Sequence, residues 1–511
     1  MHNGAFHRWL QYRLMHTFPN RNFEIINLSL TAVNSYTVLD FSMQIPKYQP
    51  DAVLIYSGHN EYYGALGIGS TSRLGGNYWW IQTVLTLRTF RFVQLMEKAA
   101  GIVTGWFVKQ EIDTRDNLMQ RMAASQQIPY GSADYQKGVD QFIRNIDKVC
   151  SNLAAHHIPV FLSTLVSNEK DMKPFISNKG RLSAFSYYQL AGKAYQRGDF
   201  ATAKRQYITA IDYDLLRFRA PQAMNVAIRK IAASYTGVYL TDSRALFEQH
   251  SPGGVLGKET LLEHVHPNLL GYALLSEAFY QELKHSRLLR PQVGSEWTLT
   301  TLLNRMPVTT VDSLSGAYQI MMLKTGWPFN EPIDPHFKRG NSISEKIAGA
   351  LAVNRISWLE AMDQLFRNYI KNNNKKAALK VTEAMILEDP STLIYYIYAG
   401  RLCFETGDYN NARYYFKRAY LLDHSDASLQ NLYLLALKTD QPKEALLYLN
   451  QLKKNQEVAA ESNREALLLQ EIVRLKQKSS KIGLNDSLRK RIALCYQQLN
   501  AEEAVAKYQQ K

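Results

Sequence analysis

A cluster of polar side chains follows an apolar stretch of the sequence. The run "AVLIYSG" (52–58) is typical of a buried strand, and it leads directly into Gly58, His59, Asn60 and Glu61. These residue types can move protons and donate hydrogen bonds to a developing negative charge. Since α/β proteins keep their binding and catalytic residues in loops at strand ends, we expect a site here. Asn60 taken alone would more simply be a turn residue.

Two other stretches carry similar side chains. The stretch "NLSLTAVNS" (27–35) ends an apparent first strand, and "EHVHPNLLGY" (263–272) precedes an apolar helical segment. The second of these places an acidic residue, Glu263, three positions before His266. Acyl transfer needs a nucleophile, a base that takes its proton, and fixed donors for the oxyanion. The three stretches together could supply the base and the donors.

In these blocks the sequence resembles the SGNH, or GDSL-type, hydrolase family. The family's Gly-x-Asn block is matched by Gly58-His59-Asn60, and its acid-x-x-His-Pro block by residues 263–267. The resemblance covers about residues 1–285 and is greatest to long bacterial chains that join such a domain to tetratricopeptide repeats. It implies an ester hydrolase with His266 as the base and Glu263 orienting its ring. It also implies an oxyanion hole formed by the Asn60 amide and the Ala32 backbone N–H.

The chain departs from the family pattern in three places. Glu263 stands where the family has aspartate, and Ala32 stands where it commonly has glycine. The family's nucleophilic serine follows the first strand, upstream of the block that contains Ala32, whereas this chain has no serine before Asn27. We therefore expect no nucleophile and no serine hydrolase activity in the chain as given. The interpretation is either a truncated form of a longer protein or a pseudoenzyme that has re-paired its sheet.

Other assignments of these polar residues are weaker. Ser29, Ser35 and Ser57 lie near the cleft but lack the strained turn that exposes an attacking oxygen. His59 and the two histidines of "EHVH" have no carboxylate or cysteine at a recognised metal spacing, so we expect neither a metal nor another cofactor. Glu61 could bind substrate hydroxyl groups or hydrogen-bond its own loop, and the sequence leaves both open.

The elements that position these blocks alternate along the chain. Strands are predicted at 23–30, 52–58, 158–166 and 236–243, and amphipathic helices at 35–49, 135–157 and 268–283. Continuous apolar strands separated by helices indicate an α/β domain with a parallel sheet covered on both faces. In flavodoxin-like strand order the first strand is central. Since it is missing here, strands 23–30 and 52–58 should border an empty position in the sheet.

A second pattern predicts an all-α solenoid. The segment at about 187–214 forms a helical hairpin inserted in the α/β domain, and its Gly-Asp-aromatic motif recurs near residue 407. Ala378, Ala412 and Ala445 are 34 and 33 residues apart, which matches the tetratricopeptide period of about 34. We predict an SGNH-like domain over 1–285, a connector over 286–350 and tetratricopeptide repeats over 351–511.

Composition limits the remaining possibilities. The net charge is +15, but the basic residues are scattered through helical segments, which argues against a nucleic-acid site. Three separated cysteines predict neither disulfides nor a zinc site. The apolar stretch at 77–96 is interrupted by arginines and should be an amphipathic helix or lid, not a membrane span. The compartment is not determined; a longer form could be exported or membrane-anchored.

The sequence therefore favours one function and leaves a second open. The first is an esterase that acts on an acyl ester, for example an acetylated carbohydrate, with repeats that bind a protein or peptide. The second is a scaffold in which the repeats bind a partner and the α/β domain is not catalytic.

Overall fold

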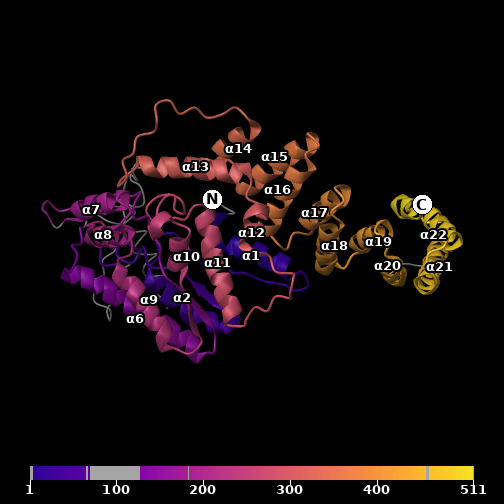
Figure 1. Cartoon of the computed structure of the whole chain (residues 1–511), viewed down its shortest axis with the longest axis horizontal. Coiled ribbons are helices and arrows are strands. Elements are labelled where there is room, and N and C mark those ends of the chain that lie inside the picture. Colours follow the sequence, from indigo (N-terminus) through magenta and orange to yellow (C-terminus); the bar gives the residue numbers. More distant parts are fainter. Residues whose placement is uncertain (1–3, 65–66, 70–126, 182, 456–459, 510–511) are drawn as a thin grey trace, which may run out of the picture. The chain divides into compact units, whose positions relative to one another are not determined.

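The computed structural model describes residues 4–64, 67–69, 127–181, 183–455 and 460–509. These residues are mostly helical and contain one small parallel sheet (Figure 1). They group into two compact units. The sheet unit comprises residues 4–306 and 317–338, and the repeat unit comprises 307–316 and 339–511. The helix predicted at 77–96 lies outside the described residues, and no described helix is long and apolar enough to cross a membrane.

The sheet has three parallel strands in the order β1-β2-β3. β1 is Val53–Ile55, β2 is Val160–Ser163 and β3 is Val238–Thr241. Val53 pairs with Val160, which in turn pairs with Val238. The parallel sheet predicted from the apolar runs is confirmed for these three segments, although each strand is shorter than its run.

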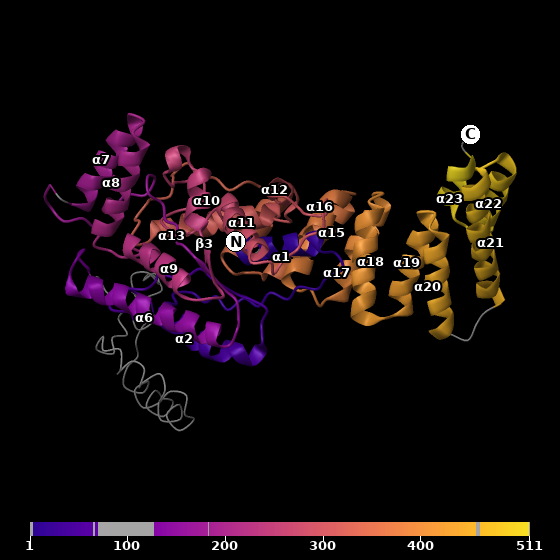
Figure 2. The same ribbon diagram turned by 60° about the horizontal axis from the view of Figure 1, so that its bottom comes forward.

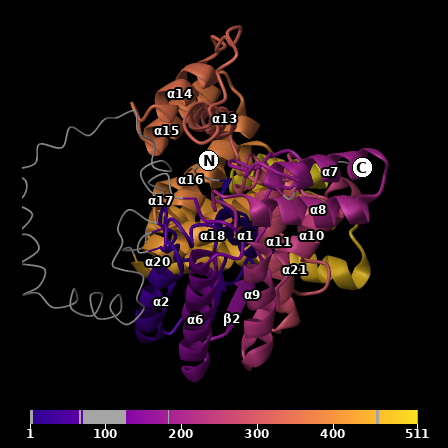
Figure 3. The ribbon, with the colours of Figure 1, turned by 90° about the vertical axis from the view of Figure 1, so that its left-hand side faces the viewer.

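Two hydrophobic cores lie on the two faces of the sheet. Val160 and Leu162 belong to one core and Phe161 to the other, as the two-residue period of a strand requires. The first core is covered by α2 (Ser35–Gln44), α6 (Ala133–Ala155) and α9 (Gln222–Ser234), which lie side by side (Figure 3). The second is covered by α1 (Phe6–Thr17), α10 (Ser243–Gln249) and α11 (Leu269–His285).

The prediction of a strand at 23–30 is wrong. The segment has no regular secondary structure, and Ile26, Leu28 and Leu30 are largely exposed. A strand exists only when its backbone pairs with a neighbour, and among the described residues no strand lies against this segment. β1 accordingly forms one edge of the described sheet. The predicted arrangement, in which strands 23–30 and 52–58 lie on either side of an empty position, is not observed among the described residues.

The inserted helical hairpin is present within the sheet unit. It consists of α7 (Ala184–Gln196) and α8 (Phe200–Tyr213), which pack through small residues such as Ala191, Ala194 and Ala203. Gly198 between them has φ 79°, a left-handed conformation that glycine adopts at little cost. The sheet unit also contains η2 (Ile45–Tyr48), η3 (Pro252–Gly254) and α12 (Leu299–Arg305). Helix α13 (Thr310–Thr325) begins among residues of the repeat unit and ends among those of the sheet unit.

The repeat unit is a series of helical hairpins. Figure 2 shows α17 to α20 as consecutive neighbours in this series. The predicted alanines Ala378, Ala412 and Ala445 are each the fourth residue of the second helix of a hairpin, and each has no exposed area. Small residues at these positions let paired helices approach closely, as the period of the sequence predicted. The helices are α14 (Ile343–Ala352), α15 (Trp358–Lys371), α16 (Lys375–Glu388), α17 (Leu393–Glu405), α18 (Tyr409–Asp423), α19 (Asp426–Lys438), α20 (Pro442–Asn455), α21 (Ala460–Ile482), α22 (Asp486–Gln498) and α23 (Glu502–Gln509).

Candidate functional site

The loop after β1 turns sharply at Gly58. This residue has φ 156°, and a Cβ atom placed on it would lie 2.5 Å from a methyl carbon of Leu165 and 3.2 Å from the ring of Phe142. The backbone therefore passes too close to the core for any larger residue. Immediately after this turn comes Asn60, whose side-chain amide has no hydrogen-bond partner within the described part of the chain. It is thus available to a ligand.

The segment that contains Ala32 packs against this loop. A Cβ atom on Gly64 would lie 2.6 Å from the carbonyl oxygen of Asn60 and 2.9 Å from that of Ala32, so the two segments are in close contact. Ala32 itself has φ 63°, in the left-handed region that favours glycine. Ala32 and Asn60, which are far apart in the predicted pattern of blocks, therefore lie in adjacent loops.

Glu61 joins the β1 loop to two helices. Its carboxylate has no exposed area and accepts hydrogen bonds from the Ser35 backbone N–H at 3.0 Å and from the Ser35 hydroxyl at 2.7 Å. It also accepts one from the side-chain amide of Gln141 at 2.5 Å. Burial raises the pKa of Glu61 to about 7, although these hydrogen bonds favour the ionised form. The buried carboxylate supports the loop and is not accessible to a substrate.

His59 connects the β1 loop with the histidine block. Its Nδ1 accepts a hydrogen bond from the backbone N–H of Ala220 at 3.2 Å, so the proton of the neutral ring is on Nε2. Burial, and to a smaller extent the charges of His264 and His266, lower the pKa of His59 to about 3. The β1 loop and the histidine block also meet at one ring, since the ring centroid of Phe218 lies 5.0 Å from that of Tyr63 of the loop and 6.1 Å from that of His264.

The histidine block is organised around the carboxylate of Glu263. Its Oε1 accepts the backbone N–H of His266 at 3.0 Å and also bonds to Nδ1 of the His266 ring. The Glu263 side chain has no exposed area, whereas 56% of the His266 side chain is exposed. An imidazole that is anchored through Nδ1 and open to solvent elsewhere has its Nε2 available as a proton acceptor.

The charges in the block depend on these contacts. Burial alone would raise the pKa of Glu263, but the adjoining imidazoles of His264 and His266 lower it below its usual range. Burial lowers the pKa of His264, so its ring is neutral near pH 7. Partial burial also disfavours the charged form of His266, but the hydrogen bond to Glu263 outweighs it and raises the pKa of His266. Glu263 is therefore an ionised acceptor at neutral pH.

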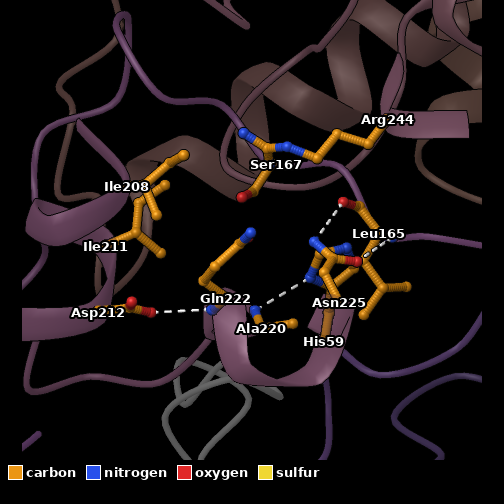
Figure 4. Close-up of a pocket in the computed structure, with 10 residues that line it drawn as sticks. All are labelled: His59, Leu165, Ser167, Ile208, Ile211, Asp212, Ala220, Gln222, Asn225 and Arg244. Atoms are coloured by element: carbon orange, nitrogen blue, oxygen red, sulfur yellow. Dashed lines mark hydrogen bonds between the residues drawn. The ribbon is translucent and has the colours of Figure 1, made fainter. Parts of the chain in front are cut away.

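A small pocket lies beside His59. Figure 4 shows the side chains of Ser167 and Gln222 directed into it, with Ile208 and Asp212 contributed by the inserted hairpin. It has room for about one water molecule. The pocket therefore does not hold a substrate, although it brings the hairpin close to the loop of Asn60.

No described serine is placed as a nucleophile. Within the described residues the ring of His266 has one hydrogen-bond partner, Glu263. Of the three serines considered from the sequence, Ser35 has its hydroxyl buried against Glu61. The described residues also contain no group of three or more side chains suited to hold a metal ion.

Comparison with known proteins gives the chain no family. No protein-family model matches the sequence, and a search of curated proteins finds no similar one.

Two participants were not assigned a role from the sequence. The ring of His264 contacts the carboxylate of Glu263. The two residues are adjacent in the sequence, but adjacency does not predict that their side chains touch. The second participant is the turn that contains Phe329, in the stretch predicted to be a connector, which packs on His264 with ring centroids 5.5 Å apart. Nothing in the local sequence indicates a contact across 65 positions.

Proposed function

We propose that the sheet unit is an acyl-ester hydrolase or acyl-transfer domain of the SGNH type, with His266 as general base. The observation that carries this proposal is the exposed imidazole of His266, held at Nδ1 by a carboxylate with no exposed area. A buried acceptor fixes the ring and stabilises the imidazolium that forms when Nε2 takes a proton. In this proposal Glu263 has the orienting role that the resemblance implied.

The oxyanion would be bound by the adjacent loops of Asn60 and Ala32. The Asn60 amide is available as a donor, and the left-handed turn at Ala32 leaves its backbone N–H outside any helix or strand. Two fixed donors of this kind stabilise the negative charge that develops on an ester carbonyl oxygen. The substrate class we propose is an acyl ester, such as an O-acetyl group on a carbohydrate.

Without a serine beside His266, the described residues support slow catalysis. The ring can deprotonate a water molecule or attack an activated ester directly through Nε2. We expect slow hydrolysis of p-nitrophenyl acetate by the purified chain and no labelling of the described serines by a fluorophosphonate.

The test compares two histidines with the same spacing to a glutamate. His266→Ala should reduce p-nitrophenyl acetate hydrolysis to the rate of the buffer. His285→Ala should leave it unchanged, since His285 also lies three residues after a glutamate, Glu282, but its side chain is 83% exposed on the end of α11. Asn60→Ala should lower the rate by about 100-fold or more if the amide binds the oxyanion.

Equal rates in the wild type and in His266→Ala would contradict the catalytic proposal. That result would favour the alternative, a scaffold whose sheet unit is not catalytic. Among the described residues the His266 ring is hydrogen-bonded to Glu263 and not to a serine, which is consistent with this alternative.

We also propose that the helical hairpins are tetratricopeptide repeats that bind a protein or peptide. Exposed apolar side chains occur on the first helices of successive hairpins: Tyr398 on α17, Leu434 on α19 and Leu467 on α21. Repeats of this kind present such residues on an extended binding surface. Leu434→Asp should abolish retention of a partner by the immobilised chain without changing its circular dichroism. Retention of the same protein by both forms would contradict the proposal.

A further inference from the structure

One carboxylate serves two imidazoles in the histidine block. While Oε1 of Glu263 bonds to His266, Oε2 accepts the backbone N–H groups of His264 and Val265 and contacts Nδ1 of the His264 ring. Within the described residues this buried Nδ1 makes no hydrogen bond of ordinary geometry, so the close contact with Oε2 is what the structure gives it. The two rings therefore hold opposite oxygen atoms of the same carboxylate.

The contacts determine which nitrogen of each ring carries hydrogen. An ionised carboxylate only accepts hydrogen bonds and repels a nitrogen lone pair, so a ring nitrogen that lies against it must carry the hydrogen. Nδ1 is therefore protonated in both His264 and His266. In the neutral His266 ring this leaves Nε2 as the accepting nitrogen, which is the state that a general base requires.

His264 packs against aromatic rings from three separate segments, one of which contributes Phe218 at 6.1 Å. Its ring centroid lies 5.5 Å from that of Phe175, in the loop after β2, and 5.5 Å from that of Phe329, in the turn after α13. Phe175 and Phe329 also contact each other at 5.3 Å. All three contacts have the edge-to-face geometry that stabilises aromatic pairs. Since only 4% of His264 is exposed, its ring has little freedom to turn away from Glu263.

We propose that His264 is a positioning residue for the Glu263–His266 pair, held in place by Phe175 and Phe329. Its Nδ1–H fixes Oε2 of Glu263, so that Oε1 remains directed at His266. This contact adds to the two backbone N–H groups on Oε2, and it helps a glutamate because its side chain has one more rotatable bond than aspartate and loses more conformational entropy when fixed. The proposal rests on the role of His266 in the proposed function, but it predicts a property that does not depend on ester hydrolysis.

The test uses two substitutions that separate hydrogen bonding from packing. His264→Asn retains an N–H donor close to the position of Nδ1 but removes the ring. His264→Phe retains the aromatic contacts but removes the donor. The measured quantity is the exchange rate of the His266 Nδ1–H with water, by NMR of the full chain labelled with [15N]histidine, with His266→Gln used to assign the resonance.

The proposal predicts opposite outcomes for the two variants. Exchange in His264→Phe should be about 10-fold faster or more, since a donor to a charged group is lost, while His264→Asn should stay near the wild-type rate. If His264 only fills space, the order is reversed, and His264→Phe resembles the wild type. The reversed order, no change in either variant, or equal acceleration in both would each overturn the proposal.

A second pair of variants tests the aromatic contacts. Phe329→Ala should accelerate exchange of the His266 Nδ1–H, because the His264 ring gains freedom to turn. Phe337→Ala is the matched control, since Phe337 lies eight residues further along the chain, is 44% exposed and contacts Tyr318. Equal exchange rates in Phe329→Ala and Phe337→Ala would overturn the role of Phe329. If the wild type hydrolyses no ester, the proposed function is overturned. The NMR outcomes for the His264 and Phe329 variants do not depend on that result.

Discussion

Glu61 and Glu263 are both buried glutamates in loops of the sheet unit, yet their carboxylates behave in opposite ways. Glu61 is surrounded by the neutral donors of Ser35 and Gln141, and burial raises its pKa to about 7. Glu263 lies between two imidazoles, which lower its pKa despite equal burial. Burial disfavours any charge, and at Glu263 partners able to carry the opposite charge reverse that effect.

This difference separates a supporting carboxylate from one that can assist proton transfer. Glu61 exchanges a proton near neutral pH but reaches no exposed group, so it holds the β1 loop to α2 and α6. Glu263 stays ionised and directs its charge to the exposed His266. Both residues are acidic side chains beside apolar stretches of the sequence. The groups that contact each carboxylate decide what it does.

The largest effect is expected from Glu263→Ala. The substitution leaves buried donors of the histidine block without an acceptor, and breaking such a charged pair costs about 3–5 kcal/mol. Hydrogen-exchange mass spectrometry of peptides that cover β2 measures this loss of stability. The control, Glu282→Ala on α11, removes a side chain that is 22% exposed and paired with the exposed His285, and should change the stability by less than about 1 kcal/mol. Equal effects of the two substitutions would contradict the anchoring role of Glu263.

The next largest effect is the pH dependence due to Glu61. A carboxyl group whose pKa is higher in the folded state binds more protons when folded, so stability falls as the pH rises. The contribution is complete below pH 4.5 and is lost by about pH 7. A shift of this size corresponds to about 3 kcal/mol. Thermal unfolding of the wild type and of Glu61→Gln from pH 4 to 8 tests this, and the variant should show the weaker dependence.

Glu263 should have the opposite sign in the same pH range. Because its pKa is lowered, its contribution to stability is present above the unfolded value of 4.5 and is lost as the pH falls. If the stability of Glu61→Gln falls with rising pH as steeply as that of the wild type, the pH dependence is not due to Glu61. That result would contradict the proposed difference between the two carboxylates.

A smaller effect is expected from Ser35→Ala. The serine hydroxyl donates to the ionised form of Glu61, so its removal should raise the pKa of Glu61 further and extend the loss of stability to higher pH. It also removes the acceptor of the Asn145 side-chain amide. The cost should be about 1–3 kcal/mol at pH 8. Ser29→Ala, at an exposed position, is the control and should have no effect on thermal unfolding.

The smallest effect is the titration of His266 itself. Glu263 raises the pKa of His266, so the stabilisation it brings is complete below pH 6.5 and is lost as the pH rises through the higher folded value. NMR titration should give a lower pKa for His266 in Glu263→Gln than in the wild type. Glu282→Gln should leave the pKa of His266 where it is. A higher value in Glu263→Gln would contradict the pairing.

Local patterns were sufficient for several elements of the fold. The apolar runs around Val53, Val160 and Val238 form the three strands. Their apolar side chains pack into the hydrophobic cores on the two faces of the sheet. The run at 23–30 has similar composition but forms no strand, since strand formation depends on a neighbour that local sequence does not provide. The periodic alanines of the hairpins were predicted correctly because their contacts are between helices adjacent in sequence.

The contacts of the candidate site also fall into those between residues near in sequence and those between distant segments. The pairing of Glu263 with His266 was predicted from the resemblance, and their separation of three residues keeps the two side chains within reach of each other. The contact of Glu61 with Gln141, 80 residues away, and that of His264 with Phe329 required the packed structure.

The sequence by itself determined the parallel strands, the helical repeats and the proximity of an acid to a histidine. All of these depend on side-chain periodicity or on neighbours within a few residues. Only the tertiary structure decided which carboxylate titrates near neutral pH, which one stays charged and which imidazole is exposed. The physical reason is that the charge of a buried group depends on the burial and partners that distant segments of the chain supply.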